Sequence, residues 1–199
     1  MINQFNGFKA ERANKNEPLP VGGYVAKILG AEIKDYSWGQ VLVLSYDIAE
    51  GAYKDFFANK YRSDTRDDKK WKGTYRINVP REDSQYAEAE KRDFNNMIWA
   101  FEESNSGFRF DWDESKFKGK AVGVIIREKE YYINGKFGIT TECGKMTSVD
   151  DIRNNTFAPM KLKKLSRRDK ERMEAEQGTA QTENNGFTSL DETDGELPF

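Results

Sequence analysis

Residues 119–149 have the sequence GKAVGVIIREKEYYINGKFGITTECGKMTSV. Two long runs rich in β-branched and aromatic residues, 119–133 and 136–149, flank the dipeptide Asn134-Gly135. A tight type I′ turn needs a positive φ at both central residues, and Asn followed by Gly adopts it readily. The segment therefore predicts a β-hairpin of two long strands.

Upstream of this hairpin the sequence predicts three more strands. The runs 23–36 (GYVAKILGAEIKDY) and 41–48 (VLVLSYDI) are rich in Val, Leu, Ile and Tyr, as strands are. The run 56–62 (FFANKYR) carries aromatic and basic residues and predicts the third strand. A short alternating segment follows at 74–79 and ends at Pro80, which cannot donate a hydrogen bond to a neighbouring strand.

One helix is expected between the third strand and the hairpin. Asp83 or Ser84 can cap its first turn, and Gly107 ends the segment. Apolar residues recur with the i, i+3, i+4, i+7 spacing of a helix face at Phe94, Met97, Ile98 and Phe101. Three strands, a helix and a closing hairpin form the element order of an OB-fold. The predicted class is mainly β, an OB-fold-like five-stranded barrel with a helix between strands 3 and 4; other α+β folds share this order.

The charge of the chain divides it into three segments. It has 199 residues, 37% hydrophobic and 33% charged, with a mean hydropathy of −0.88, which is too polar for all of it to be packed core. Residues 1–160 are electroneutral and are expected to form the OB-like domain. Residues 161–177, with seven bases and four acids, predict a basic helical connector. Residues 178–199, with five acids and no base, predict a disordered acidic tail.

The residues that the sequence lacks exclude several kinds of function. It has no histidine and only one cysteine, Cys143, so serine–histidine and cysteine–histidine catalysis and zinc sites of Cys and His are excluded. Cys143 is expected to be a small buried residue. No apolar run is long enough to cross a membrane, and the N-terminus has no signal-peptide core. We expect a cytoplasmic protein that is not an enzyme and needs no cofactor or metal.

Aromatic and basic residues are mixed between residues 53 and 76, a segment with eight basic and four acidic side chains. This combination binds single-stranded nucleic acid, because aromatic rings stack on unpaired bases and basic side chains contact the phosphates. Strand alternation must send one set of rings into the core, and the sequence leaves open which set that is. The candidate DNA-binding residues of this band are Tyr53, Lys54, Phe57, Lys60, Tyr61, Arg62, Trp71 and Lys72.

Two predicted turns carry further candidate DNA-binding residues. Tyr36 and Trp38 flank the first turn, and Tyr131, Lys136 and Phe137 flank the turn of the hairpin. In an OB-fold these are the two loops that contact an oligonucleotide. Trp38 in a Ser-Trp-Gly turn can stack on a base, or its ring can fold back on the edge of the barrel.

The last nine residues, 191–199, have the sequence DETDGELPF. Acids followed by Leu-Pro-Phe and a free carboxylate suit a peptide ligand: the acids approach a basic rim, and the final ring fills an apolar pocket. The proline stiffens the segment and lowers the entropy lost on docking. The candidate partner-binding residues are Asp191, Glu192, Asp194, Glu196, Leu197, Pro198 and Phe199.

The ending GELPF resembles the acidic tip of bacterial and phage single-stranded DNA-binding proteins. Residues 17–48, EPLPVGGYVAKILGAEIKDYSWGQVLVLSYDI, are similar to the opening of a family of phage OB-type proteins of replication and recombination. The resemblance implies a protein that coats and protects single strands in the host cytoplasm and recruits replication and repair enzymes through its tail. Because the sequence shows no oligomerisation signature, the resemblance does not imply that this chain forms a tetramer.

Two other functions are compatible with the same residues. One is an OB-like protein-binding adaptor or inhibitor, in which the aromatic band grips a peptide and not DNA. The other is a metal-dependent nuclease built on the acidic runs 111–114 and 127–130. Such a nuclease needs converging carboxylates, and the sequence offers no second cluster at an interpretable spacing.

Overall fold

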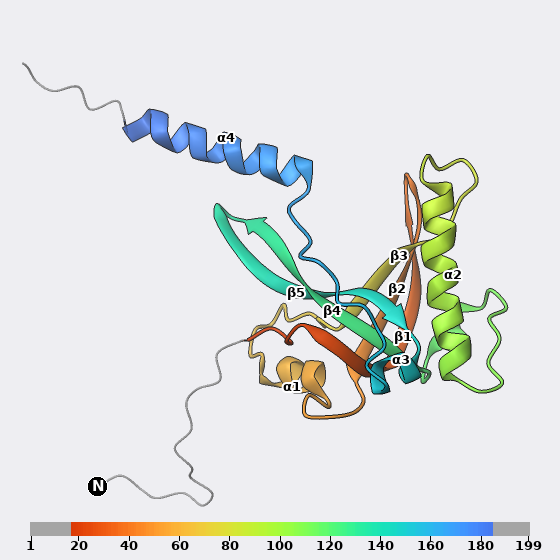
Figure 1. Ribbon diagram of the computed structural model, residues 1–199. Coiled ribbons are helices and arrows are strands. Elements are labelled where there is room, and N and C mark those ends of the chain that lie inside the picture. The colour runs from red at the N-terminus through yellow and green to blue at the C-terminus, as the bar shows by residue number, and fades with distance from the viewer. Residues whose placement is uncertain (1–16, 185–199) are drawn as a thin grey trace, which may run out of the picture. The chain divides into compact units, whose positions relative to one another are not determined.

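The computed structural model describes residues 17–184, with side chains described for 17–176 (Figure 1). The strands are β1 Gly22–Tyr36, β2 Gly39–Ile48, β3 Thr74–Asn78, β4 Ala121–Ile133 and β5 Lys136–Thr147. The helices are α1 Phe56–Ser63, α2 Ala87–Ser104, α3 Val149–Arg153 and α4 Arg167–Asn184, and Glu114–Phe117 form a 3-10 turn, η1. The predicted acidic tip, 191–199, lies outside the described residues.

The five strands form one antiparallel sheet in the order β3-β2-β1-β4-β5. Helix α2 lies between β3 and β4 in the chain. The predicted class, mainly β with five strands and a helix between strands 3 and 4, is therefore confirmed. In the described part of the chain β3 and β5 are the outer strands, so the sheet is not closed.

Local sequence signals account for the hairpin and for α2. Asn134 and Gly135 have φ values of 51° and 72°, as the predicted type I′ turn requires. The apolar face of α2 enters the core, where Phe94, Met97 and Phe101 are buried beside residues of β2. The predicted cap of this helix is wrong, because Tyr86, not Asp83 or Ser84, precedes its first turn.

The third predicted strand, 56–62, is wrong: these residues form helix α1. The cause is a contact from a neighbouring strand. The carboxylate of Asp47, on β2, accepts hydrogen bonds from the backbone N–H groups of Phe57 and Ala58, both at 2.9 Å, and so satisfies donors at the start of the helix. The third strand of the sheet is β3, within the short alternating segment 74–79.

A β-bulge interrupts the pairing of β1 with β2. The register shifts between Ile28 and Gly30, which leaves Leu29 outside the ladder. Its side chain is 42% exposed, although Ile28 beside it is buried in the core. The bulge therefore places an apolar side chain on the outer surface of the sheet.

The chain divides into two compact units. In the described part, the first comprises 17–128 and 141–161, and the second comprises the end of the hairpin, 129–140, with 162–184. Within the second unit, Arg172 donates a hydrogen bond to the backbone oxygen of Tyr132 at 2.6 Å, and the Tyr132 hydroxyl donates to Glu176 at 2.7 Å. These contacts attach α4 to the hairpin end.

Helix α4 is capped by Ser166 and extends further than expected. The backbone N–H of Asp169 donates to the Ser166 hydroxyl at 3.2 Å, which satisfies one of the free donors of the first turn. The helix then runs to Asn184, past the boundary expected at residue 177. Among residues 17–184 no helix combines the length and the apolar character that crossing a bilayer requires.

Candidate nucleic-acid interface

The outer face of β1, β2 and β3 carries the candidate site. Successive side chains of a strand point to opposite faces, and Leu42 and Leu44 of β2 are buried in the core. Val43 therefore points outward, and the register places it between Glu32 of β1 and Arg76 of β3. We call this surface the outer face. The turn between β1 and β2 lies at one end, and α1 lies beside the other end of β2 (Figure 1).

The β1–β2 turn holds a pair of stacked rings. The rings of Tyr36 and Trp38 lie nearly parallel, at 11°, with centroids 5.1 Å apart. Arg76 of β3 donates a hydrogen bond to the Tyr36 hydroxyl at 2.8 Å, which fixes the tyrosine across the end of the outer face. Trp38 remains 53% exposed, so its free side is open to a further flat partner. The ring rests on Tyr36, and this geometry suits base stacking.

At the α1 end, Trp71 anchors a second group of rings. Its indole N–H donates to the backbone oxygens of Gly73 at 3.0 Å and Tyr46 at 3.2 Å, so the ring is held in place. Tyr61 of α1 lies 5.9 Å from it, centroid to centroid, and remains exposed. Phe57 lies 5.4 Å from the core residue Tyr46 and packs against the core. Phe57 is therefore a packing residue more than a binding one.

The remaining predicted residues of this band surround α1. Tyr53 is exposed and makes an edge contact with Tyr24, at 5.7 Å between centroids. Arg62 is exposed and donates a hydrogen bond to Asn59 at 3.2 Å. Lys60 donates to the backbone oxygen of Glu17 at 2.7 Å.

Burial and the neighbouring charge of Lys72 lower the pKa of Lys60. The two ammonium groups therefore repel each other, and an anion placed near both of them would relieve that repulsion. A phosphate group of a nucleic acid is such an anion. This arrangement makes the α1 end of the site favourable for negative charge.

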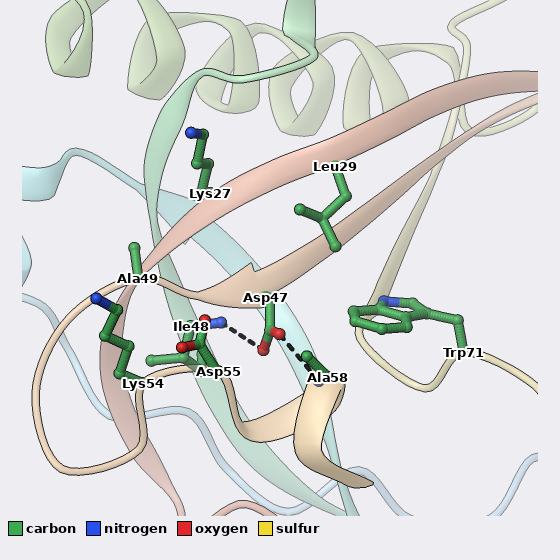
Figure 2. Close-up of a pocket in the computed structure, with 9 residues that line it drawn as sticks. All are labelled: Lys27, Leu29, Asp47, Ile48, Ala49, Lys54, Asp55, Ala58 and Trp71. Atoms are coloured by element: carbon green, nitrogen blue, oxygen red, sulfur yellow. Dashed lines mark hydrogen bonds between the residues drawn. The ribbon is translucent and has the colours of Figure 1, made fainter. Parts of the chain in front are cut away.

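A depression of about 400 Å³ lies where β1, β2 and α1 meet (Figure 2). Asp47 is 6% exposed, and its oxygens already accept three backbone N–H groups, including that of Ile48 at 2.8 Å. The backbone donors at the start of α1 are thus already bonded to a side chain of the protein. The lining residues are Lys27, Leu29, Asp47, Ile48, Ala49, Lys54, Asp55, Ala58 and Trp71.

Several lysines of this region have no acidic partner. Among residues 17–176, Lys27, Lys54 and Lys72 form no ion pair. In contrast, Lys34 lies 3.5 Å from Glu32, and Arg66 lies 2.6 Å from Asp64. A cation that no carboxylate neutralises is available to a phosphate, so these three lysines are the candidates for backbone contacts.

The three residues predicted at the hairpin lie in the second unit. Lys136 and Phe137 are exposed, and Tyr131 is half-buried beside Gly138. The structure therefore groups the other ten predicted residues in the first unit and these three in the hairpin unit. Ile133 and Ile139 are also exposed on this hairpin end.

The sequence interpretation missed Lys27, Leu29 and Asp55. Lys27 interrupts an otherwise apolar stretch of β1, which indicates an outward position. A glycine inside a strand, here Gly30, is typical of a bulge, and the bulge is what exposes Leu29. No comparable signal marks Asp55, because its place in the depression depends on α1.

Cys143 is buried, as predicted. Its side chain lies on β5 and is 8% exposed, and burial raises the pKa of its thiol to about 12. The thiol is therefore held in its neutral form and is a poor nucleophile at neutral pH. In the part of the chain with described side chains, no three acidic or cysteine side chains are grouped as metal ligands.

The chain matches no protein-family model and no curated protein.

Proposed function

We propose that this chain is a single-stranded DNA-binding protein. The observation that carries the proposal is the combination, within the first unit, of exposed rings at Trp38 and Tyr61 with the unpaired cations of Lys27, Lys54 and Lys72. Each base–ring stack contributes about 1–3 kcal/mol to the binding free energy. Each phosphate contact adds a contribution that decreases as the salt concentration rises.

The mode of action is equilibrium binding, with no bond made or broken. Bases that are already unpaired stack on the Tyr36–Trp38 pair and on the rings near α1, while the lysines neutralise phosphates at the α1 end. In duplex DNA the faces of the bases are covered by their neighbours, so stacking on a protein ring first requires unstacking. The site therefore favours single strands.

The wider role rests on the sequence. By its resemblance to phage and bacterial proteins with an acidic tip, the chain would protect single strands during phage replication and recombination in the host cytoplasm. The tip, 191–199, would recruit partner enzymes. This part of the proposal depends on the residues Leu197-Pro198-Phe199, which lie outside the described part of the chain.

A fluorescence titration with oligo-dT tests the proposal. Stacking on Trp38 should quench its emission, and the affinity should fall steeply as salt is raised. Because the chain has four tryptophans, Trp38→Phe is run in parallel and should remove a large part of the quenching. If oligo-dT caused no quenching at any salt concentration, the result would favour the peptide-binding adaptor. Degradation of the oligonucleotide when magnesium is added would show a nuclease.

A further inference from the structure

The depression beside α1 has the composition of a site for one nucleotide. Leu29 and the half-buried ring of Trp71 supply apolar surface, and the carbon atoms of Ala49 and Ala58 add to it. In Figure 2, Lys27 and Leu29 both extend from β1, and Leu29 is the one directed toward Trp71. The volume of the depression, about 400 Å³, lies within the usual range for small-ligand pockets, about 300–1,000 Å³.

The positions of the two lysines suit the charged part of a nucleotide. Lys27 comes from β1 and Lys54 from the turn before α1, and both line the depression (Figure 2). Neither has an ion-pair partner among the residues with described side chains. A base inserted between Leu29 and Trp71 would therefore have cations available for its flanking phosphates.

One carboxylate of the depression is left unused by the fold. Asp55 stands at the position before the first residue of α1, yet its side chain makes no capping hydrogen bond, because Asp47 satisfies those donors. No hydrogen bond or ion pair of the Asp55 carboxylate occurs among the described side chains. An ionised carboxylate only accepts hydrogen bonds, so a ligand that displaces water from this exposed side chain must offer a donor.

We propose that this depression binds one unpaired base that carries an exocyclic amino group, with Asp55 accepting from the amino group and Leu29 and Trp71 contacting the ring. Cytosine presents such a donor at N4, whereas thymine presents the acceptor O4 at the same place. The site would thus give a preference for cytosine over thymine within a single strand. The inference rests on the proposed function and adds base selectivity to it.

The test compares the affinities of the full chain for dC12 and dT12 at the same salt concentration and pH 8. We expect dC12 to bind about tenfold more tightly, the size of one hydrogen bond to a charged group. Asp55→Gly should bring the two affinities within about twofold of each other. Glycine suits this position, because Asp55 has a φ of 59° and glycine adopts that conformation without strain.

Two further variants separate the pocket from the rest of the surface. Leu29→Ala should weaken the binding of both oligonucleotides severalfold, whereas Ile139→Ala, which shortens another exposed side chain on the hairpin, should leave both affinities nearly unchanged. Equal binding of dC12 and dT12 by the unaltered chain would contradict the proposed base selectivity of the depression but not the proposed function. Binding of neither oligonucleotide would overturn both.

Discussion

The carboxylate of Asp47 on β2 accepts a hydrogen bond from the backbone N–H of Ala58 at 2.9 Å, and this contact attaches helix α1 to the sheet. The other carboxylate oxygen accepts from Phe57 at 2.9 Å and Ile48 at 2.8 Å. A single buried side chain from a strand thus satisfies donors at the start of a helix. The Tyr61 ring and the depression depend on the position of that helix.

Replacing Asp47 should destabilise the folded chain. In Asp47→Asn an amide NH₂ group replaces one accepting oxygen and faces a backbone donor, so the free energy of unfolding should fall by about 1–3 kcal/mol. Urea denaturation followed by circular dichroism measures the change. Asp55→Asn is the matched control: its side chain makes no capping bond, and asparagine tolerates its positive φ, so it should change stability by less than about 0.5 kcal/mol. Equal losses in both variants would contradict the capping role of Asp47.

Removing the exposed ring of Trp38 should weaken DNA binding with little effect on folding. Trp38→Ala should cost about 1–3 kcal/mol of binding free energy for oligo-dT, the contribution of one base stack. Fluorescence anisotropy of a labelled oligonucleotide measures the affinity. Trp99→Ala serves as control, because Trp99 is about equally exposed but lies on α2. If the two variants bound alike, the β1–β2 turn would not be a stacking site.

The lysines without an ion-pair partner should contribute to the salt dependence of DNA binding. Replacing Lys27, Lys54 and Lys72 together by alanine should make the slope of log affinity against log salt shallower by about 0.7 for each phosphate that is no longer neutralised. Lys91→Ala, on α2, removes a lysine that already lies 3.8 Å from Glu88 and should leave the slope unchanged. An unaltered slope in the triple variant would mean that other cations neutralise the phosphates.

The buried thiol of Cys143 should make stability depend on pH in the alkaline range. The unfolded chain releases this proton near the ordinary value of 9.0, whereas burial raises the pKa in the folded chain to about 12. The folded state therefore holds more protons across this interval, and its stability should fall as pH rises above 9, by up to about 1.4 kcal/mol per pH unit. Denaturation at pH 8, 9 and 10 measures the slope.

In Cys143→Ala, the fall in the free energy of unfolding between pH 9 and 10 should be absent. The part that begins above pH 10 should persist, because burial also raises the pKa values of Tyr46 and Tyr75. In the native chain the thiol should also resist a disulfide reagent at pH 8 and react only after unfolding. Rapid reaction in the native state would contradict its burial.

Removing Leu197 to Phe199 should separate partner binding from DNA binding. A chain that ends at Glu196 should no longer capture replication proteins in a pull-down, because the apolar ring and its carboxylate are gone. Its affinity for oligo-dT should stay the same or rise, since no stacking residue is removed. A large drop in DNA affinity would contradict the proposed role of the tip.

Local sequence signals were sufficient for several elements. Asn134-Gly135 predicted the hairpin because the turn depends on the φ preferences of two adjacent residues. The spacing of Phe94, Met97 and Phe101 predicted α2 because a helix face repeats within one segment. The failure at 56–62 has the opposite cause: the residue that stabilises the start of α1 lies on another element, and no spacing within FFANKYR reveals it.

The same distinction applies to the candidate site. The sequence alone identified the aromatic residues of the turns and the band of rings and bases, because these are matters of composition and position along the chain. Only the tertiary structure decided which rings are packed, as Phe57 is, and which are exposed, as Trp38 is. It also brought Leu29, Lys54 and Trp71 into one depression. Burial and proximity depend on contacts between segments far apart in the chain, and the local pattern of residues does not specify those contacts.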